Sequence, residues 1–471
     1  MNREKQLIKN TAIITIGKIC TQMITFFLLP IYTAVLSTEE YGVVDLLNTL
    51  ISLLLPIITF QIEQAVFRYL IDVRSEKDKI TEIISTTIFA VIIQSIVYIA
   101  IFLCISGFIH NEYKYFLATN VIACIFSSIM LQISRGLGDN KTYAIGSFIT
   151  AVSTILFNIL FIVIFKFGAY GMLTASFLAN LICFIYVFIA KRVYMYIKLK
   201  AFGKVILRKM WKYSIPLIPN AISWWVFNSS DRIIVSSILG VGANGVLAIA
   251  HKFPSVYITI YNIFNMTWTE SASMHINDKD NSKFFSKIIN TMFEIFSCLC
   301  LGIIAFMPIV FPIMINSAYN EAYNQIPILM LGALANVGIG LISVVYIAKK
   351  KTKEVAKISV CAAIINIVVN LLLINFIGLY AASISTFVAY LSMLIYRIFD
   401  VKKYVNLKVN KMMLIRTIIM LIILVVIYYI NNIILNIFSI IITIIYCIIV
   451  NKNNIKFMID MITSKFNKGS T

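Results

Sequence analysis

Long apolar stretches recur along the whole chain and are separated by short polar connections. A helix needs about twenty apolar residues to cross a bilayer, so we expect roughly fourteen membrane-spanning helices. Their approximate limits are 9–36, 43–70, 80–109, 115–134, 142–165, 169–190, 213–239, 243–269, 285–311, 322–347, 354–376, 379–399, 412–430 and 433–450. The chain is 60% hydrophobic and only 13% charged, which excludes a water-soluble domain. The predicted fold class is an all-α polytopic membrane protein.

Basic residues are concentrated in every second connection. Lys and Arg cluster near both ends of the chain and in stretches such as 74–79, 191–212 and 349–357, whereas the connections between them hold almost none. The positive-inside rule therefore places both termini in the cytoplasm and requires an even number of spans. The formal net charge of +20 follows from this topology, so we do not expect a nucleic-acid partner.

No motif for catalysis or metal binding occurs. All eight cysteines lie in apolar stretches without disulfide or metal-site spacing. The sequence lacks a phosphate-binding G-x-x-x-x-G-K-[ST] loop, an H-E-x-x-H pattern and a nucleophile–base arrangement. We therefore expect neither an enzyme nor a bound cofactor or metal. The basic N-terminus precedes a long apolar run without a cleavage site, and we expect it to remain as the first helix.

Two pairs of short motifs recur at similar separations. LSTEEYGVVDLL (36–47) matches LGVGANGVLAIA (239–250), which aligns Gly42 with Gly245. FGAYGMLTAS (167–176) resembles IGLYAASIST (377–386). The separations are 203 and 210 residues, and each copy would hold six helices. We expect two six-helix lobes of the same orientation, related by a pseudo-two-fold axis along the membrane normal.

The longest basic connection marks the boundary between these lobes. It reads KRVYMYIKLKAFGKVILRKMWK (191–212), and we expect an amphipathic helix in it at the membrane surface, although an ordinary linker would also carry basic residues. The predicted organisation is an N-terminal lobe, a cytoplasmic linker, a second lobe, and two extra helices with a cytoplasmic tail. Their limits are 1–190, 191–212, 213–400 and 401–471.

Charged and titratable residues inside the spans gather in four helices. A charge at bilayer depth costs several kcal/mol unless it faces a partner or water. The first, second, seventh and eighth predicted helices carry Lys18, Asp45, Glu63, Arg68, Asp231, Arg232, His251 and Lys252. In the repeat, the first and second helices correspond to the seventh and eighth. We therefore expect a central cleft lined by these four helices, where transporters built from repeats bind their substrates.

The charges in this cleft suggest a division of roles. The cations Lys18, Arg68, Arg232 and Lys252 suit a phosphate or pyrophosphate group. Asp45, Glu63, Asp231 and His251 are candidates for binding a coupling H⁺ or Na⁺. Structural alternatives remain open, because adjacent Asp231 and Arg232 point to different faces and either could form an interhelical salt bridge. Arg68 could extend to the inner surface, and His251 could hydrogen bond to a neighbouring helix.

Four segments taken in order resemble a known family. They are ITIGKICTQMITFFLLPIYTAVLSTEEYGVVDLL (14–47), VFRYL (66–70), RGLGDNKTYAIGSF (135–148) and SSDRIIVSSILGVGANGVLAIAHKF (229–253). The chain resembles the polysaccharide biosynthesis flippases, especially O-antigen and capsule repeat-unit flippases, of the multidrug/oligosaccharidyl-lipid/polysaccharide exporter superfamily. One departure is MTWTESAS (266–273), where many relatives have a proline.

The resemblance implies a lipid substrate. Such a protein would move an undecaprenyl-pyrophosphate-linked oligosaccharide across the bacterial inner membrane by alternating access, coupled to H⁺ or Na⁺. The sugar would pass through the cleft while the prenyl tail stays in lipid. By resemblance, the family's Asp-Arg pair becomes Asp231 and Arg232, and its other cations become Arg68 and Lys252. A polysaccharide polymerase and chain-length proteins are the expected partners, with membrane lipids around the protein.

Three other functions remain as alternatives. A drug or cation antiporter of the same superfamily would need an acidic cavity with few cations, unlike the set described above. A peptidoglycan-precursor flippase is disfavoured because the first two predicted helices hold no dense arginine cluster. A non-transporting scaffold for a polysaccharide synthase complex is the third alternative.

Overall fold

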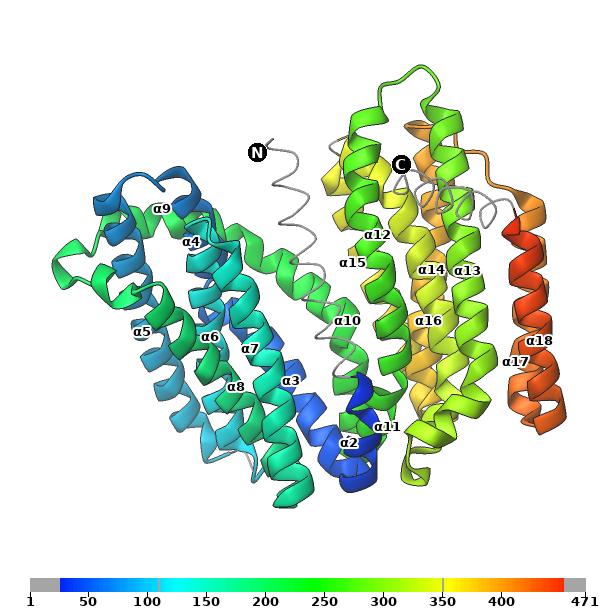
Figure 1. Ribbon diagram of the computed structural model, residues 1–471, viewed down its shortest axis with the longest axis horizontal. Helices are drawn as coiled ribbons and strands as arrows, with labels where there is room; N and C mark the ends of the chain where they lie inside the picture. Colours follow the sequence, from blue (N-terminus) through cyan, green and yellow to red (C-terminus); the bar gives the residue numbers. More distant parts are fainter. Residues whose placement is uncertain (1–25, 109–110, 350, 453–471) are drawn as a thin grey trace, which may run out of the picture. The chain divides into compact units, whose positions relative to one another are not determined.

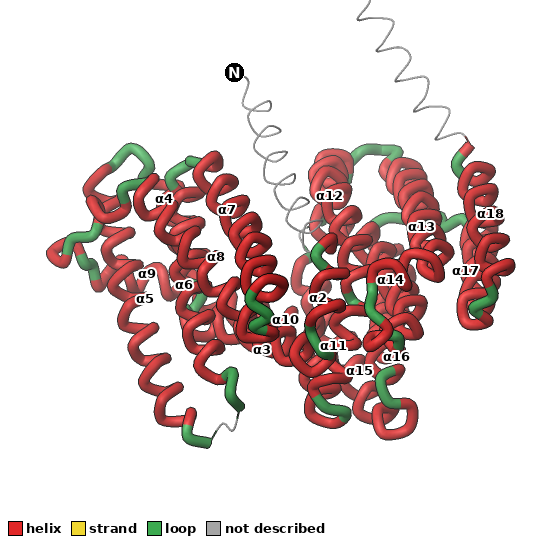
Figure 2. The backbone as a smooth tube through the Cα atoms, turned by 60° about the horizontal axis from the view of Figure 1, so that its bottom comes forward, coloured by secondary structure: helices red, strands yellow, loops and turns green. Residues whose placement is uncertain are grey.

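The computed structural model describes residues 26–108, 111–349 and 351–452 (Figure 1). These residues divide into two compact units, one up to Ala248 and one from Ile249 onward. The described residues form helices joined by loops, without any strand (Figure 2). Eleven of these helices are long and apolar enough to cross a membrane. The prediction of an all-α polytopic membrane protein is therefore confirmed. The total of fourteen spans stays a prediction, because most of the first predicted helix lies outside the described residues.

The first unit begins with short α2 and ends within α11. In chain order it contains α2 (Leu29–Val35), α3 (Thr38–Ile58), α4 (Ile62–Asp72), α5 (Lys77–Ser106), α6 (Lys114–Gly136), α7 (Asn140–Asn158) continued by a π-helical turn (Ile159–Ile164), α8 (Gly168–Ala190), α9 (Lys204–Ser214), α10 (Ile218–Ile238) and α11 (Val241–Ala250).

The second unit holds the remaining long helices. They are α12 (Lys252–His275), α13 (Asn281–Met314), α14 (Glu321–Ala348), α15 (Thr352–Ile377), α16 (Tyr380–Asp400), α17 (Lys411–Ile430) and α18 (Ile433–Val450). α14 is the most buried of the spans in this unit and contacts α12, α13 and α16. The repeat-based lobe limits stay a prediction.

Two long helices, α10 and α12, are not among the eleven apolar ones. They belong to two of the four helices predicted to line the cleft, the seventh and the eighth, and both are long enough to span a bilayer. Their polar residues, including Asp231 and Arg232 in α10, lower the mean hydropathy. The same polarity that indicates a functional helix thus weakens its signal as a membrane span.

The second predicted helix, 43–70, is not continuous. It divides into α3 and α4 at Phe60 and Gln61, which both adopt positive φ angles, 52° and 54°. The Thr59 hydroxyl group accepts a hydrogen bond from the Gln61 amide and donates to Glu63, closing the break locally. No glycine or proline occupies the break itself, so the sequence pattern did not indicate it.

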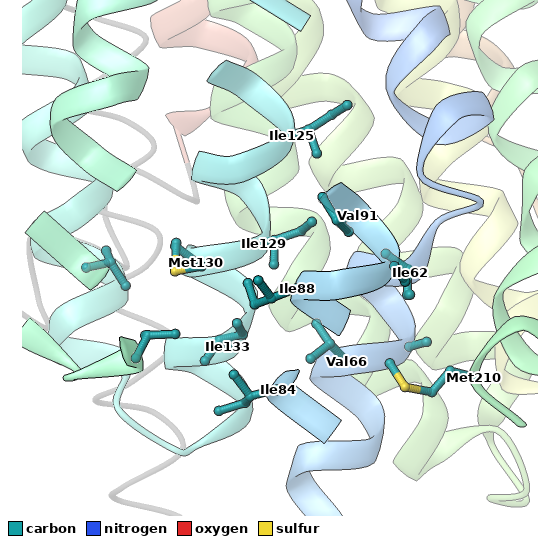
Figure 3. Close-up of a cluster of buried hydrophobic side chains, with 14 of the residues drawn as sticks. Ile62, Val66, Ile84, Ile88, Val91, Ile125, Ile129, Met130, Ile133 and Met210 are labelled. Carbon is teal, nitrogen blue, oxygen red and sulfur yellow. The ribbon is translucent and has the colours of Figure 1, made fainter. Parts of the chain in front are cut away.

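The main core of the first unit is formed by side chains of α3, α4, α5, α6, α8 and α9. Ile62 and Val66 of α4, Ile88 of α5, Ile129 of α6 and Met210 of α9 pack together there (Figure 3). Each of these side chains is buried. Apolar helices gain little from burial within a lipid environment, so close packing of branched side chains is the main attraction between them.

The predicted amphipathic helix of the linker is present as α9. Its apolar residues Leu207, Met210 and Trp211 pack against the core of the first unit. Its cations are exposed on the other side, namely Lys204, Arg208, Lys209 and Lys212. Two linker contacts fix its approach to α5, where Ser85 donates to the Tyr196 carbonyl and Thr86 accepts from the Gly203 amide.

Two acidic residues of the second unit outside the predicted cleft, Glu294 and Asp400, are paired with basic residues. Glu294 of α13 binds Arg416 of α17 at 3.0 Å, which attaches one of the two extra helices to the bundle. Asp400 accepts a hydrogen bond from Tyr346 at 2.8 Å and pairs with Lys403 at 2.6 Å. The Glu294–Arg416 pair lies within the helices α13 and α17, whereas the contacts of Asp400 lie at the end of α16.

Asp139 stabilises the connection between α6 and α7. It caps α7 through the Thr142 amide and hydroxyl groups and pairs with Lys191 at 2.9 Å. Burial opposes ionisation, but the hydrogen bonds from Thr142 and then Lys191 outweigh it and lower the pKa of Asp139 to about 2. The carboxylate therefore stabilises the fold above the unfolded-state pKa of about 4, and this contribution disappears as pH falls from about 4 to about 2.

We expect Asp139→Asn to lower stability at pH 7 by on the order of 1 kcal/mol, because asparagine retains the cap but loses the charge. The thermal midpoint of the purified protein in detergent should differ between the two forms at pH 7 and converge as pH approaches 2. An equal difference at both pH values would show that the charge is not responsible.

Candidate functional site

The N-terminal parts of α3 and α11 cross at two glycines. A Cβ atom added to Gly42 would lie 2.0 Å from the Val241 carbonyl oxygen, and one added to Gly245 would lie 2.0 Å from the Thr38 carbonyl oxygen. Both distances are far shorter than any carbon–oxygen contact. The backbones therefore touch directly, as helices in membranes do where small residues meet.

The contacts at this crossing are reciprocal. Gly42 lies against Val241 while Gly245 lies against Thr38, and both Thr38–Val241 and Gly42–Gly245 are 203 positions apart. The same separation joins Glu39 to Gly242, which are also neighbours there. A two-fold axis produces such reciprocal contacts, because each residue of one copy meets the same partner position in the other copy. It supports the internal repeat.

An ion pair lies close to the crossing, because Asp45 is only three residues after Gly42 in α3. Arg232 Nε of α10 is 3.0 Å from Asp45 Oδ2 of α3, and their side chains are only 23% and 16% exposed. Asn244 of α11 is fully buried and donates to the Gly42 carbonyl at 3.1 Å and to Asp45 Oδ2 at 3.4 Å. Asp45 thus links α3 to both α10 and α11.

Further hydrogen bonds join α3 to elements on either side. Trp225 of α10 donates through Nε1 to the Thr49 carbonyl at 2.9 Å and to the Ser52 hydroxyl at 3.1 Å. At the start of α3, Glu40 forms a reciprocal cap with Ser37 and also accepts from the Ala169 amide at 3.3 Å. These bonds fix the position of Asp45 relative to Arg232.

In this arrangement the Arg232 guanidinium group is paired with a single carboxylate group, that of Asp45. Removal of one partner of a largely buried ion pair leaves an uncompensated charge, which costs about 3–5 kcal/mol. A second anion bound to Arg232 could take the place of the Asp45 carboxylate and compensate the charge of the guanidinium group. A proton or Na⁺ on Asp45 would in turn weaken its attraction to Arg232. An anionic ligand would therefore compete with Asp45 for Arg232.

Asp231 lies beside this pair, whereas Glu63 and Arg68 make their contacts within the segment around α4. Asp231 is buried and accepts the backbone amide hydrogen of Arg232 at 2.9 Å. Glu63 is buried in the first turn of α4, where Thr59 donates to it at 2.9 Å. Arg68 is half-exposed and pairs with Asp72 of its own helix at 2.6 Å. Lys18 lies outside the described residues.

His251 and Lys252 belong to the second unit. His251 precedes α12 and its carbonyl accepts the Ser255 amide, while Lys252 is the first residue of that helix. Both side chains are partly buried. A site shared by these two residues and Arg232 stays a prediction. Trp268, a residue that could stack on a sugar, is buried in this unit and donates to the Leu341 carbonyl.

Comparison with known families identifies the protein class. Residues 7–269, more than half of the chain, match the family described as polysaccharide biosynthesis protein. The chain belongs to this polysaccharide biosynthesis protein family. The matched region includes the whole α3–α10–α11 arrangement. No curated protein matches the chain.

Several solved structures have a fold similar to that of this polysaccharide biosynthesis protein. The lipid II flippase MurJ in an inward closed conformation has a TM-score of 0.68 at 16% identity, covering 96% of this chain and 100% of that one. A multidrug resistance MATE transporter of the MOP superfamily, inward-facing, has a TM-score of 0.63 at 12% identity, covering 81% and 95%. The MATE transporter ClbM in complex with Rb⁺ has a TM-score of 0.53 at 16% identity, covering 88% and 96%. These likenesses establish a shared fold.

Sequence reasoning about this polysaccharide biosynthesis protein did not assign roles to Gly42, Gly245 or Asn244, and it considered Trp225 only as an aromatic side chain that could stack on a sugar or anchor the helix at the membrane interface. The repeat alignment contained a usable signal, because equivalent residues that lie near a two-fold axis contact each other. Asn244 was also notable as an amide in an apolar helix, where it needs a partner. The partner of Arg232 was among the predicted residues, but the pairing itself was not predicted.

Proposed function

We propose that the protein moves an undecaprenyl-pyrophosphate-linked oligosaccharide from the inner to the outer leaflet of the bacterial cytoplasmic membrane, for O-antigen, capsule or exopolysaccharide synthesis. Both termini would lie in the cytoplasm. The Asp45–Arg232 ion pair carries this proposal, because it keeps a largely buried arginine available to an anionic headgroup. Membership of the polysaccharide biosynthesis family supports the class of product.

The ion pair suggests a coupling step within alternating access. A pyrophosphate group offers several oxygens to a guanidinium group, so it can replace the single carboxylate contact of Asp45. Asp45 then becomes able to take up H⁺ or Na⁺, and its release restores the pair after the substrate has left. Lys18, Arg68 and Lys252 are further candidates for the headgroup, and Glu63, Asp231 and His251 for the ion.

One alternative substrate is favoured by a specific observation. The solved structure described as a lipid II flippase matches 96% of this chain with a TM-score of 0.68, so a peptidoglycan precursor is the second candidate. The likeness to a multidrug resistance MATE transporter makes drug efflux a further candidate function. The arginine held beside Asp45 argues against cationic drugs, because it would repel them.

Reconstituted vesicles test the proposal. The purified protein would be placed in vesicles that contain a labelled undecaprenyl-pyrophosphate-linked oligosaccharide, lipid II, or the cationic dye ethidium, with protein-free vesicles as controls. We expect the oligosaccharide lipid to become accessible to an external glycosidase at least tenfold faster with protein, and faster still under a pH or Na⁺ gradient. Transport of lipid II alone would favour the second candidate, and transport of ethidium alone would contradict both.

A further inference from the structure

An apolar groove lies on the first unit, away from the Asp45–Arg232 pair. It has a volume of about 660 Å³, within the range of about 300–1,000 Å³ that small-molecule pockets occupy. Its walls come from the second half of α3, the second half of α5, the start of α6, the linker and α9, and they expose almost only carbon although Gln94 and Tyr98 are among them. A polar ligand would lose its hydrogen bonds there, so the groove favours hydrocarbon.

The groove is open along one side of α5. Ile93, Val97 and Ile101 line it and are 57%, 51% and 53% exposed. Because α5 is one of the membrane-spanning helices, this exposed side faces the hydrocarbon of the bilayer. A chain already dissolved in the membrane can therefore enter laterally without crossing water.

The length of the groove favours a long chain. Along α5 it extends from Ala90 to Ile105, about 22 Å at the helical rise of 1.5 Å per residue. One leaflet contributes only half of a hydrocarbon core that is about 30 Å thick. The acyl chain of a phospholipid ends near the midplane, so it would leave part of the groove unfilled. A longer polyprenyl chain would fill it.

The charge at one end of the groove fits an anionic headgroup. Phe202, Leu207 and Trp211 close that end, and the last two belong to α9. The α9 helix also presents four exposed cations, Lys204, Arg208, Lys209 and Lys212, and contains no acidic residue. Lys204 and Arg208 are three residues before the groove residues Leu207 and Trp211, so they are neighbours of these residues on the helix surface and would attract a phosphate attached to a chain in the groove.

We infer that the groove between α3, α5 and α9 binds the polyprenyl tail of the transported lipid. This inference rests on the proposed function and adds to it a specific site for the tail, which would otherwise remain in bulk lipid. A tail held along α5 across more than one leaflet stays bound while the headgroup crosses the membrane. The bound tail would also raise the local concentration of the headgroup.

Photolabelling of the full-length protein in nanodiscs tests this site. The probe is undecaprenyl phosphate with a diazirine in its tail, and mass spectrometry locates the labelled peptides. We expect labelling to concentrate on residues 90–105, to be competed by excess undecaprenyl phosphate and not by phosphatidylglycerol, and to fall at least tenfold in Val97→Trp. Leu372→Trp is the matched control, because Leu372 is an exposed residue of α15 outside the groove.

Two results would overturn the inference. Labelling spread evenly over α5, α15 and α17, or unchanged in Val97→Trp, would show that the groove has no preference for the tail. Equal competition by phosphatidylglycerol would show an ordinary phospholipid site. The probe carries no sugar, so labelling does not require transport. Vesicle transport without labelling of the groove contradicts only this inference, whereas labelling without transport of any oligosaccharide lipid contradicts only the proposed function.

Discussion

Replacing Gly245 with alanine is expected to abolish polysaccharide export and to reduce the amount of folded protein severalfold. The new methyl group would lie 2.0 Å from the Thr38 carbonyl oxygen, a backbone atom that cannot rotate away. Such overpacking costs about 1–3 kcal/mol and more where backbone must shift. The gain in helix propensity of alanine over glycine, about 1 kcal/mol, is too small to compensate.

Membrane abundance, the thermal midpoint in detergent and surface polysaccharide would be measured together for this variant. Gly302→Ala is the matched control, because Gly302 also lies within a membrane-spanning helix and a Cβ atom there meets nothing within 4 Å. The control should be neutral or slightly stabilising. Gly42→Ala should behave like Gly245→Ala, since its Cβ would meet the Val241 carbonyl in the same way. Normal stability of either crossing variant would contradict the direct backbone contact.

The second large effect is expected at Arg232. We expect Arg232→Ala to lower export at least tenfold in the native host and to cause lipid-linked repeat units to accumulate inside the cell. The variant removes the proposed headgroup cation and leaves the Asp45 carboxylate without its partner at 3.0 Å. Arg232→Lys should restore export partly, because lysine keeps the charge but loses the two-pronged geometry of the guanidinium group.

The exchange of the two residues separates a structural role from a substrate role. In the double variant Asp45→Arg with Arg232→Asp, the ion pair can re-form, so stability should recover relative to the single variants. Export should stay low, because the cation has moved from α10 to α3. Full recovery of export in the exchanged protein, or normal export by Arg232→Ala at normal abundance, would show that Arg232 acts only as a structural partner.

Much of the architecture follows from local features of the sequence. Apolar length and the positions of basic residues depend on how each segment partitions between water and lipid, so they can be read one segment at a time. The membrane class, α9 and the long helices were predicted in this way. The break between α3 and α4 was missed, because left-handed Phe60 and Gln61 are held by contacts with Thr59 and Glu63 and by no residue typical of a turn.

The candidate site was only partly accessible to the same reasoning. The sequence identified Asp45, Arg232 and Asp231 as charges that need partners or water, because their cost in a membrane is independent of the fold. It placed Arg68 in the same group, whereas the structure pairs Arg68 with Asp72 on α4. Arg68 and Asp72 are four residues apart on one helix, but whether their side chains point toward each other depends on the side-chain conformations, which the sequence does not show.

By itself the sequence determined the fold class, and it indicated the internal repeat and the charged residues that need a partner or water, because each of these depends on the residue types and their spacing. Only the tertiary structure decided that Asp45 of α3 meets Arg232 of α10, and that Gly42 meets its own repeat mate, Gly245. Such pairings depend on the rotation of each helix about its axis, and a shift of one residue turns a side chain by about 100°. They become fixed only when the helices pack against one another.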